Sequence, residues 1–204
     1  MFSIKESLKY GWQKSKEHLE LVLFTTLLTL GVGFFVGDKK YGFFNFLLMI
    51  FLLIIRIGYT KIFLRIYDGE SPKFVEIFQE YRTFWRYLGT SILTCLTILG
   101  GFILLIIPGI FWAVRFSFAP IIVVDTKSGP VISMKESWAI TKGKFWKILL
   151  FWLTIIGFNM LGVLALGIGL LVTIPVSNFA SIYVYRELTK TKAGLISTPS
   201  PQTS

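Results

Sequence analysis

Residues 145–166 read FWKILLFWLTIIGFNMLGVLAL, an apolar stretch of 22 residues whose only charge, Lys147, lies near its start. An α-helix rises about 1.5 Å per residue, so about 20 such residues cross the roughly 30 Å hydrocarbon core of a bilayer. Uninterrupted apolar runs of this length are typical of membrane-spanning helices and not of soluble domains. The stretch therefore predicts a transmembrane helix and decides the class of the fold.

Five further apolar stretches of similar length contain almost no charge. They are Leu19–Val36, Tyr41–Tyr59, Tyr87–Ile107, Gly109–Val124 and Gly169–Tyr185. The chain is 54% hydrophobic and only 16% charged, whereas a soluble domain has about 25% charged residues. Together the six stretches predict an all-α, polytopic membrane helix bundle with six transmembrane helices.

The bundle is expected to form one transmembrane domain over residues 1–193, because no polar stretch is long enough for a second domain. Residues 194–204 are rich in Ser, Thr and Pro. Such a segment buries too little apolar surface to offset its conformational entropy, so we expect a disordered C-terminal tail.

The basic residues collect in alternate connections. Seventeen of the 21 Lys and Arg residues lie before the first stretch, between the second and third, between the fourth and fifth or at the start of the fifth, or after the sixth, whereas Lys39 and Lys40 alone lie in the other connections. Cytoplasmic loops carry the excess of Lys and Arg. We therefore expect a multi-pass protein of the cell membrane with both termini cytoplasmic. This distribution accounts for the net charge of +10 without a nucleic-acid partner.

Three segments, 3–14, 72–83 and 131–142, place apolar residues at helical spacing between charged ones. They are too short and polar to span, so they are expected to lie as amphipathic helices in the headgroup layer. Residues 3–8 match residues 133–138 at four of six positions. Candidate interfacial residues are Trp12, Trp85, Trp138 and Trp146, since tryptophan favours membrane–water boundaries.

The hairpins that follow these segments are alike. Phe84-Trp85-Arg86-Tyr87-Leu88 resembles Phe145-Trp146-Lys147-Ile148-Leu149, and the second hairpin is expected to turn at Pro108-Gly109. Asp68 and Asp125 each lie three residues before a serine at the start of a connection. One interpretation is three repeats of interfacial helix plus transmembrane hairpin, about 60 residues apart. The alternative is that basic, aromatic-flanked loops are common to polytopic proteins and match by chance.

Three runs in order, Ile106–Arg115, Ala119–Asp125 and Ser137–Trp146, resemble the membrane domain of glycerophosphoryl diester phosphodiesterases and related bacterial multi-pass families of unknown function. The resemblance implies a prokaryotic membrane protein whose own activity is not established. In some members of that group a soluble phosphodiesterase barrel is fused to the membrane part. The resemblance does not extend to those catalytic residues.

The chemistry-bearing residues are few. His18 is the single histidine and Cys95 the single cysteine. Phosphodiester cleavage and most hydrolyses need a nucleophile and base, or several metal ligands, in one place. The sequence therefore predicts a protein that is not an enzyme, with no catalytic residue, no metal site and no cofactor.

Arg115 is the most pointed polar feature, because it lies near the middle of the fourth stretch. A central arginine costs about 2.5–3.5 kcal/mol on insertion, so it should face the bundle and find a partner there. Either Arg115 pins the structure by binding carbonyl groups or it binds an anionic group. The candidate binding residues are Arg115, Asn159 and Asn178. Arg56, by contrast, lies close enough to Lys61 for its long stem to reach the inner interface.

These features favour a non-catalytic integral membrane protein whose partners are membrane lipids, including anionic headgroups, or another membrane protein of unknown identity. The alternative is a small transporter or permease with a site near Arg115. Transporters usually carry several polar groups at mid-depth, and here Arg115 is essentially the single charge there.

Overall fold

The computed structural model describes residues 2–35, 42–70, 72, 83–165 and 167–197. These residues form helices and no strand, which confirms the all-α class. The helices are α1 (Ile4–Glu17), α2 (Leu19–Phe35), α3 (Gly42–Tyr67), α4 (Phe84–Leu104), α5 (Ile106–Phe116), α6 (Ala119–Thr126), α7 (Pro130–Thr141), α8 (Phe145–Leu164) and α9 (Leu170–Ser197).

Four segments within the described residues are long and apolar enough to cross a membrane. They are Phe43–Tyr67, Phe84–Leu104, Ile106–Thr126 and Phe145–Leu164, the third of which joins α5 and α6. Leu19–Gly31 is a shorter apolar helix, and α9 holds the sixth expected stretch. The helices are thus compatible with a membrane protein, and the number of spans established by length and composition is four.

The outer faces of these helices are apolar and uncovered. At the tip of the α4–α5 hairpin, Ile103 is 86% exposed and Ile107 80% exposed. Leu164 and Ile168 are likewise exposed at the tip of the α8–α9 hairpin. Soluble monomers rarely expose contiguous apolar surface on this scale. A hydrocarbon environment covers such surface at no cost, so the exposed faces support a place in the membrane.

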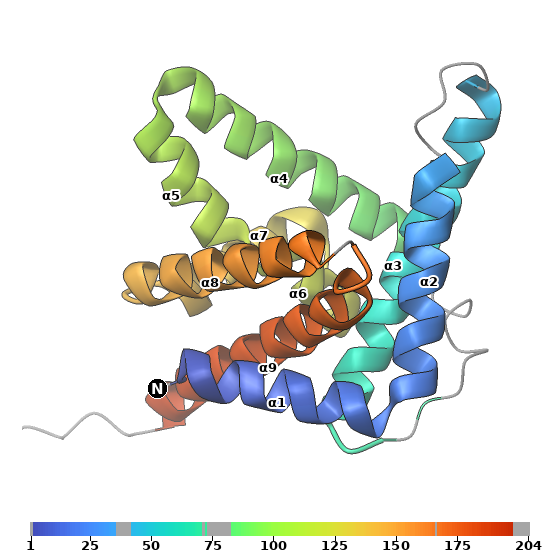
Figure 1. The fold of residues 1–204 in the computed structure, drawn as a ribbon. Coiled ribbons are helices and arrows are strands. Elements are labelled where there is room, and N and C mark those ends of the chain that lie inside the picture. The colour runs from blue at the N-terminus through green and yellow to red at the C-terminus, as the bar shows by residue number, and fades with distance from the viewer. Residues whose placement is uncertain (1, 36–41, 71, 73–82, 166, 198–204) are drawn as a thin grey trace, which may run out of the picture.

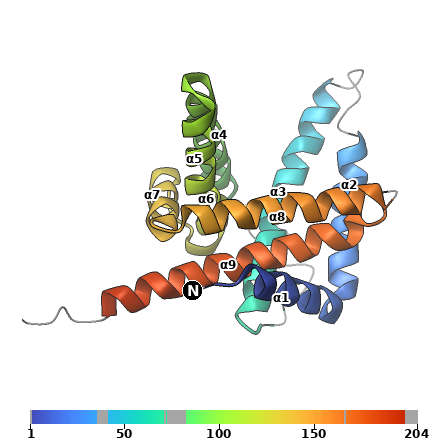
Figure 2. The same ribbon diagram turned by 60° about the vertical axis from the view of Figure 1, so that its left-hand side comes forward.

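The paired helices run in three directions from a common centre (Figures 1 and 2). The α2–α3 pair stands upright in both views, the α8–α9 pair runs across both, and the α4–α5 pair leans away in the first. Buried phenylalanines fill the centre, and Phe63 and Phe179 stack there with ring centroids 3.9 Å apart. In lipid, such packing is held by van der Waals contact rather than by exclusion of water.

The α4–α5 turn is three residues earlier than the sequence predicts. Leu105, with φ −171° and ψ 153°, is a single extended residue between the two helices. Pro108 instead lies in the first turn of α5, where the missing N–H costs no helical hydrogen bond. The expected turn at Pro108-Gly109 was wrong for this reason: proline is as compatible with a helix start as with a turn.

Two of the three expected amphipathic segments are helices. Segment 3–14 is α1, capped by Ser3, whose hydroxyl accepts a hydrogen bond from the Glu6 N–H at 3.5 Å. Segment 131–142 is α7, whose N-cap is Gly129 rather than Ser128. The Ser128 hydroxyl is instead paired with that of Ser133 at 2.8 Å. Segment 72–83 lies almost entirely outside the described residues.

The α4–α5 and α8–α9 hairpins make the same close contact at a constant offset of 61 positions. A Cβ atom on Gly101 would lie 2.8 Å from Cε3 of Trp112. A Cβ atom on Gly162 would lie 2.5 Å from Oγ1 of Thr173. Both members of the second pair are 61 positions after those of the first. In each hairpin a glycine therefore lets the return helix approach at the same level.

The helices α1 and α7 also contact equivalent places, although α7 does not bury the expected apolar stripe: Val131 is exposed, whereas Ser133 and Ser137 are buried. The hydroxyl of Thr141 on α7 donates to the Arg115 carbonyl at 3.4 Å. On α1, a Cβ atom on Gly11 would lie 2.4 Å from the Val176 carbonyl oxygen. Gly11 and Thr141 differ by the offset that relates residues 3–8 to 133–138, and Arg115 and Val176 by 61 positions. Each of these two helices thus packs on the return helix of a hairpin: α7 packs on α5, and α1 packs on α9.

Candidate binding cavity between the hairpins

A cavity of about 410 Å³ lies between the three helix pairs, with walls from α2, α3, α4, α6, α8 and α9. Its size falls in the range of small-molecule sites. Threonine, serine, asparagine and tyrosine side chains alternate with isoleucines on its walls. The cavity therefore combines an apolar lining with many hydrogen-bonding groups, as sites for amphipathic ligands do.

Arg56 on α3 is the charged residue among the described residues that line this cavity. Its guanidinium has no hydrogen bond, ion pair or ring contact to another described residue. The candidate span Phe43–Tyr67 continues well past Lys61, so Arg56 lies near the middle of α3. The expectation that the long stem of Arg56 reaches the inner interface stays a prediction, because Lys61 and Arg65 follow on the same helix and α3 can extend beyond the hydrocarbon region.

Asn159 and Asn178, two of the three predicted binding residues, both line the cavity. The Asn178 Nδ2 donates to the Tyr59 hydroxyl at 3.3 Å, which joins α9 to α3. The Asn159 Nδ2 donates to the Ile155 carbonyl and to Ser177 Oγ, both at 2.9 Å. The amides thus fix the wall of the cavity and connect the helix pairs across it.

Two buried polar atoms of this wall have no partner among the described residues, namely Asn159 Oδ1 and Trp152 Nε1. An unsatisfied buried polar group costs about 1–3 kcal/mol. Such atoms are commonly matched by a water molecule, an ion or another bound group. Both atoms belong to residues of α8 that line the cavity.

Arg115, the third predicted residue, lies elsewhere. Its side chain is enclosed by α5 and α7, and the residue is 9% exposed. The guanidinium carbon is 5.0 Å from the ring centroids of both Phe111 and Trp138, a cation–π geometry. The Arg115 carbonyl accepts the Ser137 hydroxyl at 2.7 Å. The arrangement attaches α7 to α5 and does not bring Arg115 to Asn159 or Asn178.

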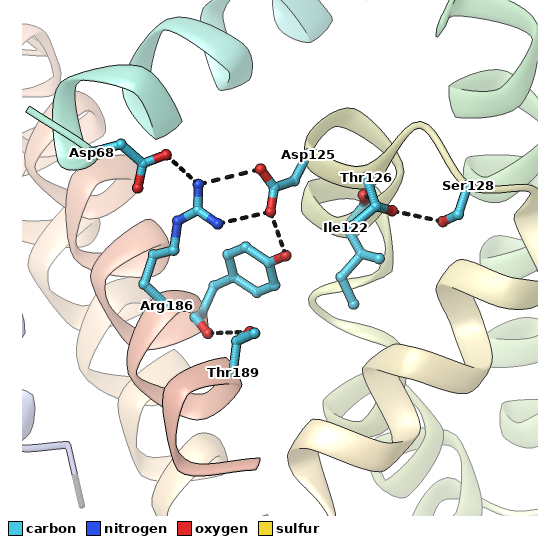
Figure 3. Close-up of polar contacts among 8 residues, drawn as sticks. Asp68, Ile122, Asp125, Thr126, Ser128, Arg186 and Thr189 are labelled. Atoms are coloured by element: carbon cyan, nitrogen blue, oxygen red, sulfur yellow. Dashed lines mark hydrogen bonds and ion pairs between the residues drawn. The ribbon is translucent and has the colours of Figure 1, made fainter. Parts of the chain in front are cut away.

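A second polar cluster joins the helix pairs at the end where α3 and α6 finish (Figure 3). Arg186 on α9 binds Asp125 bidentately, with Nη1–Oδ2 at 2.8 Å and Nη2–Oδ1 at 3.2 Å. Arg186 Nη2 also pairs with Asp68. The Tyr185 hydroxyl donates to Asp125 Oδ2 at 2.8 Å. We call these four residues the Arg186 junction.

The Arg186 junction was missed at the sequence level, although Asp68 and Asp125 were singled out as matched positions. The signal that would have found it is the 61-position offset, since Arg186 follows Asp125 by the same interval that separates Trp85 from Trp146. Asp68 precedes Asp125 by 57 positions and so does not fit this offset. Arg186 lies between the two carboxylates and reduces their mutual repulsion.

The four candidate interfacial tryptophans divide into two groups. Trp12, Trp85 and Trp146 are exposed, the last two to more than 70%. Trp85 and Trp146 begin α4 and α8, respectively. Trp138 is instead half-buried and covers Arg115, with its ring also against Phe111 and Phe116. Trp138 therefore holds α7 in place, and the other three are available to the interface.

Lysines near the chain ends have ordinary surface partners. Lys190 donates to the Tyr67 hydroxyl at 3.2 Å, and this hydrogen bond raises the pKa of Lys190. Hydrogen bonds from Lys14 and Gln13 lower the pKa of Glu17. Within the described part of the chain, no group of three or more His, Cys, Asp or Glu side chains could hold a metal ion.

Residues 95–192 match a family described as "Protein of unknown function (DUF975)". A stretch of 126 residues is 32% identical to an uncharacterized protein of Mycobacterium bovis, and 31% identical to one of Mycobacterium tuberculosis. It covers 61% of this chain but only 38% of each relative, so the chain matches about two fifths of their length. No solved structure matches.

The matched family and these relatives carry no stated activity. The resemblance to families of unknown function therefore has support, and nothing in the matches points to a phosphodiesterase. The family match begins at Cys95 in α4 and ends at Lys192 in α9. It includes Asn159 and Asn178 of the cavity and Asp125 and Arg186 of the junction, but not Arg56.

Proposed function

We propose that this chain is a non-catalytic, multi-pass protein of the cell membrane that binds membrane lipid and through it assists another membrane component. The observation that carries the proposal is the cavity of about 410 Å³ between helices whose outer faces are exposed and apolar. Lipid is the ligand class to which such a cavity is accessible from the membrane itself. A site of this kind requires no catalytic group.

The finer architecture belongs to the same proposal. We take α2 and α9 as the first and sixth spans, both termini as cytoplasmic, and the chain as three copies of amphipathic helix plus hairpin. The distribution of Lys and Arg supports the orientation. The contacts repeated at an offset of 61 positions support the copies. The likeness to the membrane domain of glycerophosphoryl diester phosphodiesterases is kept as a likeness of architecture and adds no activity.

The orientation is tested by reporter fusions. Fusions after Lys40 and after Gly167 are expected to report the outside, and fusions after Asp68 and after Thr191 the inside. A reversed pair would contradict the assignment of the termini. Loss of signal at all four sites would instead indicate that the fusions disturb insertion, which immunodetection of each full-length fusion in the membrane fraction controls for.

Lipid binding is tested by native mass spectrometry of the full chain purified in a mild detergent. The expected result is a stoichiometric lipid adduct that survives gentle removal of the detergent. A spectrum of bare protein, from preparations that keep their helical content and melt cooperatively, would contradict the proposal.

A small transporter or permease is the second candidate, favoured by the same cavity because it lies between helix pairs rather than on one face. The site would then be the cavity and not Arg115, which α7 covers. Transport is tested in liposomes reconstituted with the full chain, by the flux of a small organic anion. Lipid binding without flux would favour the first function.

A further inference from the structure

We propose that Arg56 binds the phosphate of an anionic lipid whose headgroup occupies the cavity between the helix pairs. The inference rests on the proposed lipid-binding function and specifies the class of lipid and the residue that recognises it. It differs from the sequence-based expectation, in which Arg115 either pins the structure or binds the anionic group.

Arg56 places a positive charge in the wall of the cavity. Arg56 lies 11 residues before Tyr67, roughly 16 Å from that end of α3 at 1.5 Å per residue. A cation within a membrane helix bundle costs free energy unless it is paired or hydrated. No carboxylate is among the described residues that line the cavity. The lining therefore favours an anionic ligand beside Arg56 and disfavours a cationic one.

Arg56 also differs from the other described arginines in the contacts that its side chain makes. Arg186 binds two carboxylates, Arg65 pairs with Glu70 at 3.4 Å, and Arg115 lies against two aromatic rings. Arg86 donates to the Lys127 carbonyl. Each of these has a contact within the chain, although Nε and Nη1 of Arg115 are buried without a hydrogen-bond partner among the described residues. Arg56 has no hydrogen bond, ion pair or ring contact to a described residue. Its guanidinium presents five N–H donors, and two of them match a phosphate bidentately.

The other residues of the cavity wall suit a phosphate that is attached to an organic group. Thr60, one turn after Arg56, and Asn178 and Tyr59 add hydrogen-bonding groups beside the guanidinium. Ile121, Ile174 and other apolar side chains complete the lining. A volume of about 410 Å³ accommodates a headgroup but not two acyl chains, which would leave along the exposed apolar faces of the helices. A phosphate with an attached glycerol fits these surroundings better than a bare inorganic ion.

The test compares lipid retention by the wild type and by Arg56→Gln, with Lys61→Gln as the matched control. Lys61 is a cation on the same helix that does not line the cavity. The full chain is purified, delipidated with excess phosphatidylcholine, and titrated with phosphatidylglycerol during native mass spectrometry. We expect Arg56→Gln to weaken phosphatidylglycerol binding at least tenfold and Lys61→Gln to leave it unchanged. Arg56→Lys, which keeps the charge but not the bidentate fork, is expected to lose less.

The thermal melting temperature in phosphatidylcholine alone verifies the fold of each variant. Because Arg56 has no partner to lose, Arg56→Gln is expected to melt at or above the wild-type temperature there, and to lose the stabilisation by phosphatidylglycerol. Equal retention of phosphatidylglycerol by wild type and Arg56→Gln would overturn the inference and leave the proposed function intact. The absence of any lipid adduct from the wild type would instead contradict the proposed function.

A separate arm distinguishes lipid from free phosphate. Inorganic phosphate at matched concentration is expected to produce no shift in melting temperature that depends on Arg56. If it stabilises the wild type as strongly as phosphatidylglycerol does, and fails to stabilise Arg56→Gln, the assignment of a lipid is overturned.

Discussion

Arg186 and Arg56 are both arginines between helix pairs, but only Arg186 has carboxylate partners among the described residues. Arg186 meets two carboxylates and is bound bidentately by Asp125. Arg56 lines a cavity in which the described residues offer it no counter-charge. A cation paired within the chain serves the fold, and breaking the pair leaves a buried charge at a cost in stability. A cation without such a partner is a candidate for binding an anion from outside. The comparison thus distinguishes an arginine that is paired within the chain from the one that we propose binds a ligand.

The largest effect is expected from breaking the Arg186 junction. Asp125→Asn leaves Arg186 with Asp68, whose side chain is 42% exposed, in place of Asp125 at 14%. Removing one partner of a largely buried pair costs about 3 kcal/mol, so the melting temperature in detergent should fall by several degrees. The control is Glu187→Gln, which breaks a surface pair with Lys190 and should cost less than about 0.5 kcal/mol. Equal melting temperatures of the two variants would contradict a stabilising role of the Arg186 junction.

The next effect comes from the packing that holds α9, and therefore Arg186, in position. Gly11→Ala places a Cβ atom 2.4 Å from the Val176 carbonyl oxygen. Because this neighbour is backbone, α1 must move away from α9, at a cost of about 1–3 kcal/mol. The matched control is Gly31→Ala on α2, where no atom lies within 4 Å, and where alanine should stabilise the helix slightly. Chemical unfolding followed by circular dichroism compares them, and a stabilising Gly11→Ala would contradict the close α1–α9 contact.

Arg115 is intermediate between the two arginines, since its partners are rings rather than carboxylates. Arg115→Gln should cost about 1 kcal/mol, the scale of the lost cation–π contacts. The loss of melting temperature is expected to be the same with and without phosphatidylglycerol, because Arg115 does not line the cavity. A fall in melting temperature confined to the sample with phosphatidylglycerol would indicate that Arg115, and not Arg56, binds the lipid.

The smallest effect on stability is expected at Arg56 itself. In phosphatidylcholine alone, Arg56→Gln removes an unpaired cation. The free energy of unfolding should stay within about 1 kcal/mol of the wild-type value or rise, and the melting temperature should follow it. Arg186→Gln, measured in parallel, should melt well below it. If Arg56→Gln proves as destabilising as Arg186→Gln in the absence of anionic lipid, Arg56 has a structural partner and the contrast between the two residues disappears.

The sequence was informative where a feature depends on hydrophobicity alone. The run over 145–166 predicts α8 nearly to the residue, and the spacing of apolar residues predicts α1 and α7. It was less informative at helix ends. The second stretch was taken to finish at Tyr59, whereas α3 continues to Tyr67, because a helix can extend beyond the hydrocarbon region without a change in backbone hydrogen bonding.

Contacts between helix pairs were beyond prediction for a different reason. Arg186 meets Asp68 across more than a hundred residues of chain, and such pairings depend on the directions in which the hairpins run. Periodicity carries no information on those directions. The cavity likewise exists only between elements, so Arg56 could be recognised as unpaired only after every acidic residue near it had been placed. Asn159 and Asn178 were found early because an amide in an apolar run is conspicuous on its own.

The packing of α1 on α9 has a consequence for biosynthesis. Gly11 leaves the ribosome 165 residues before Val176, an interval of roughly 8–33 s at about 5–20 residues per second. During that time the face of α1 that carries Ser7, Gly11 and Ser15 has no α9 to receive it. An amphipathic helix can wait at the bilayer surface, so we expect the docking of α1 to be the final step of folding. A cysteine crosslink between α1 and α9 should then appear only on nascent chains stalled after α9 has emerged, and its absence from full-length chains would rule this order out.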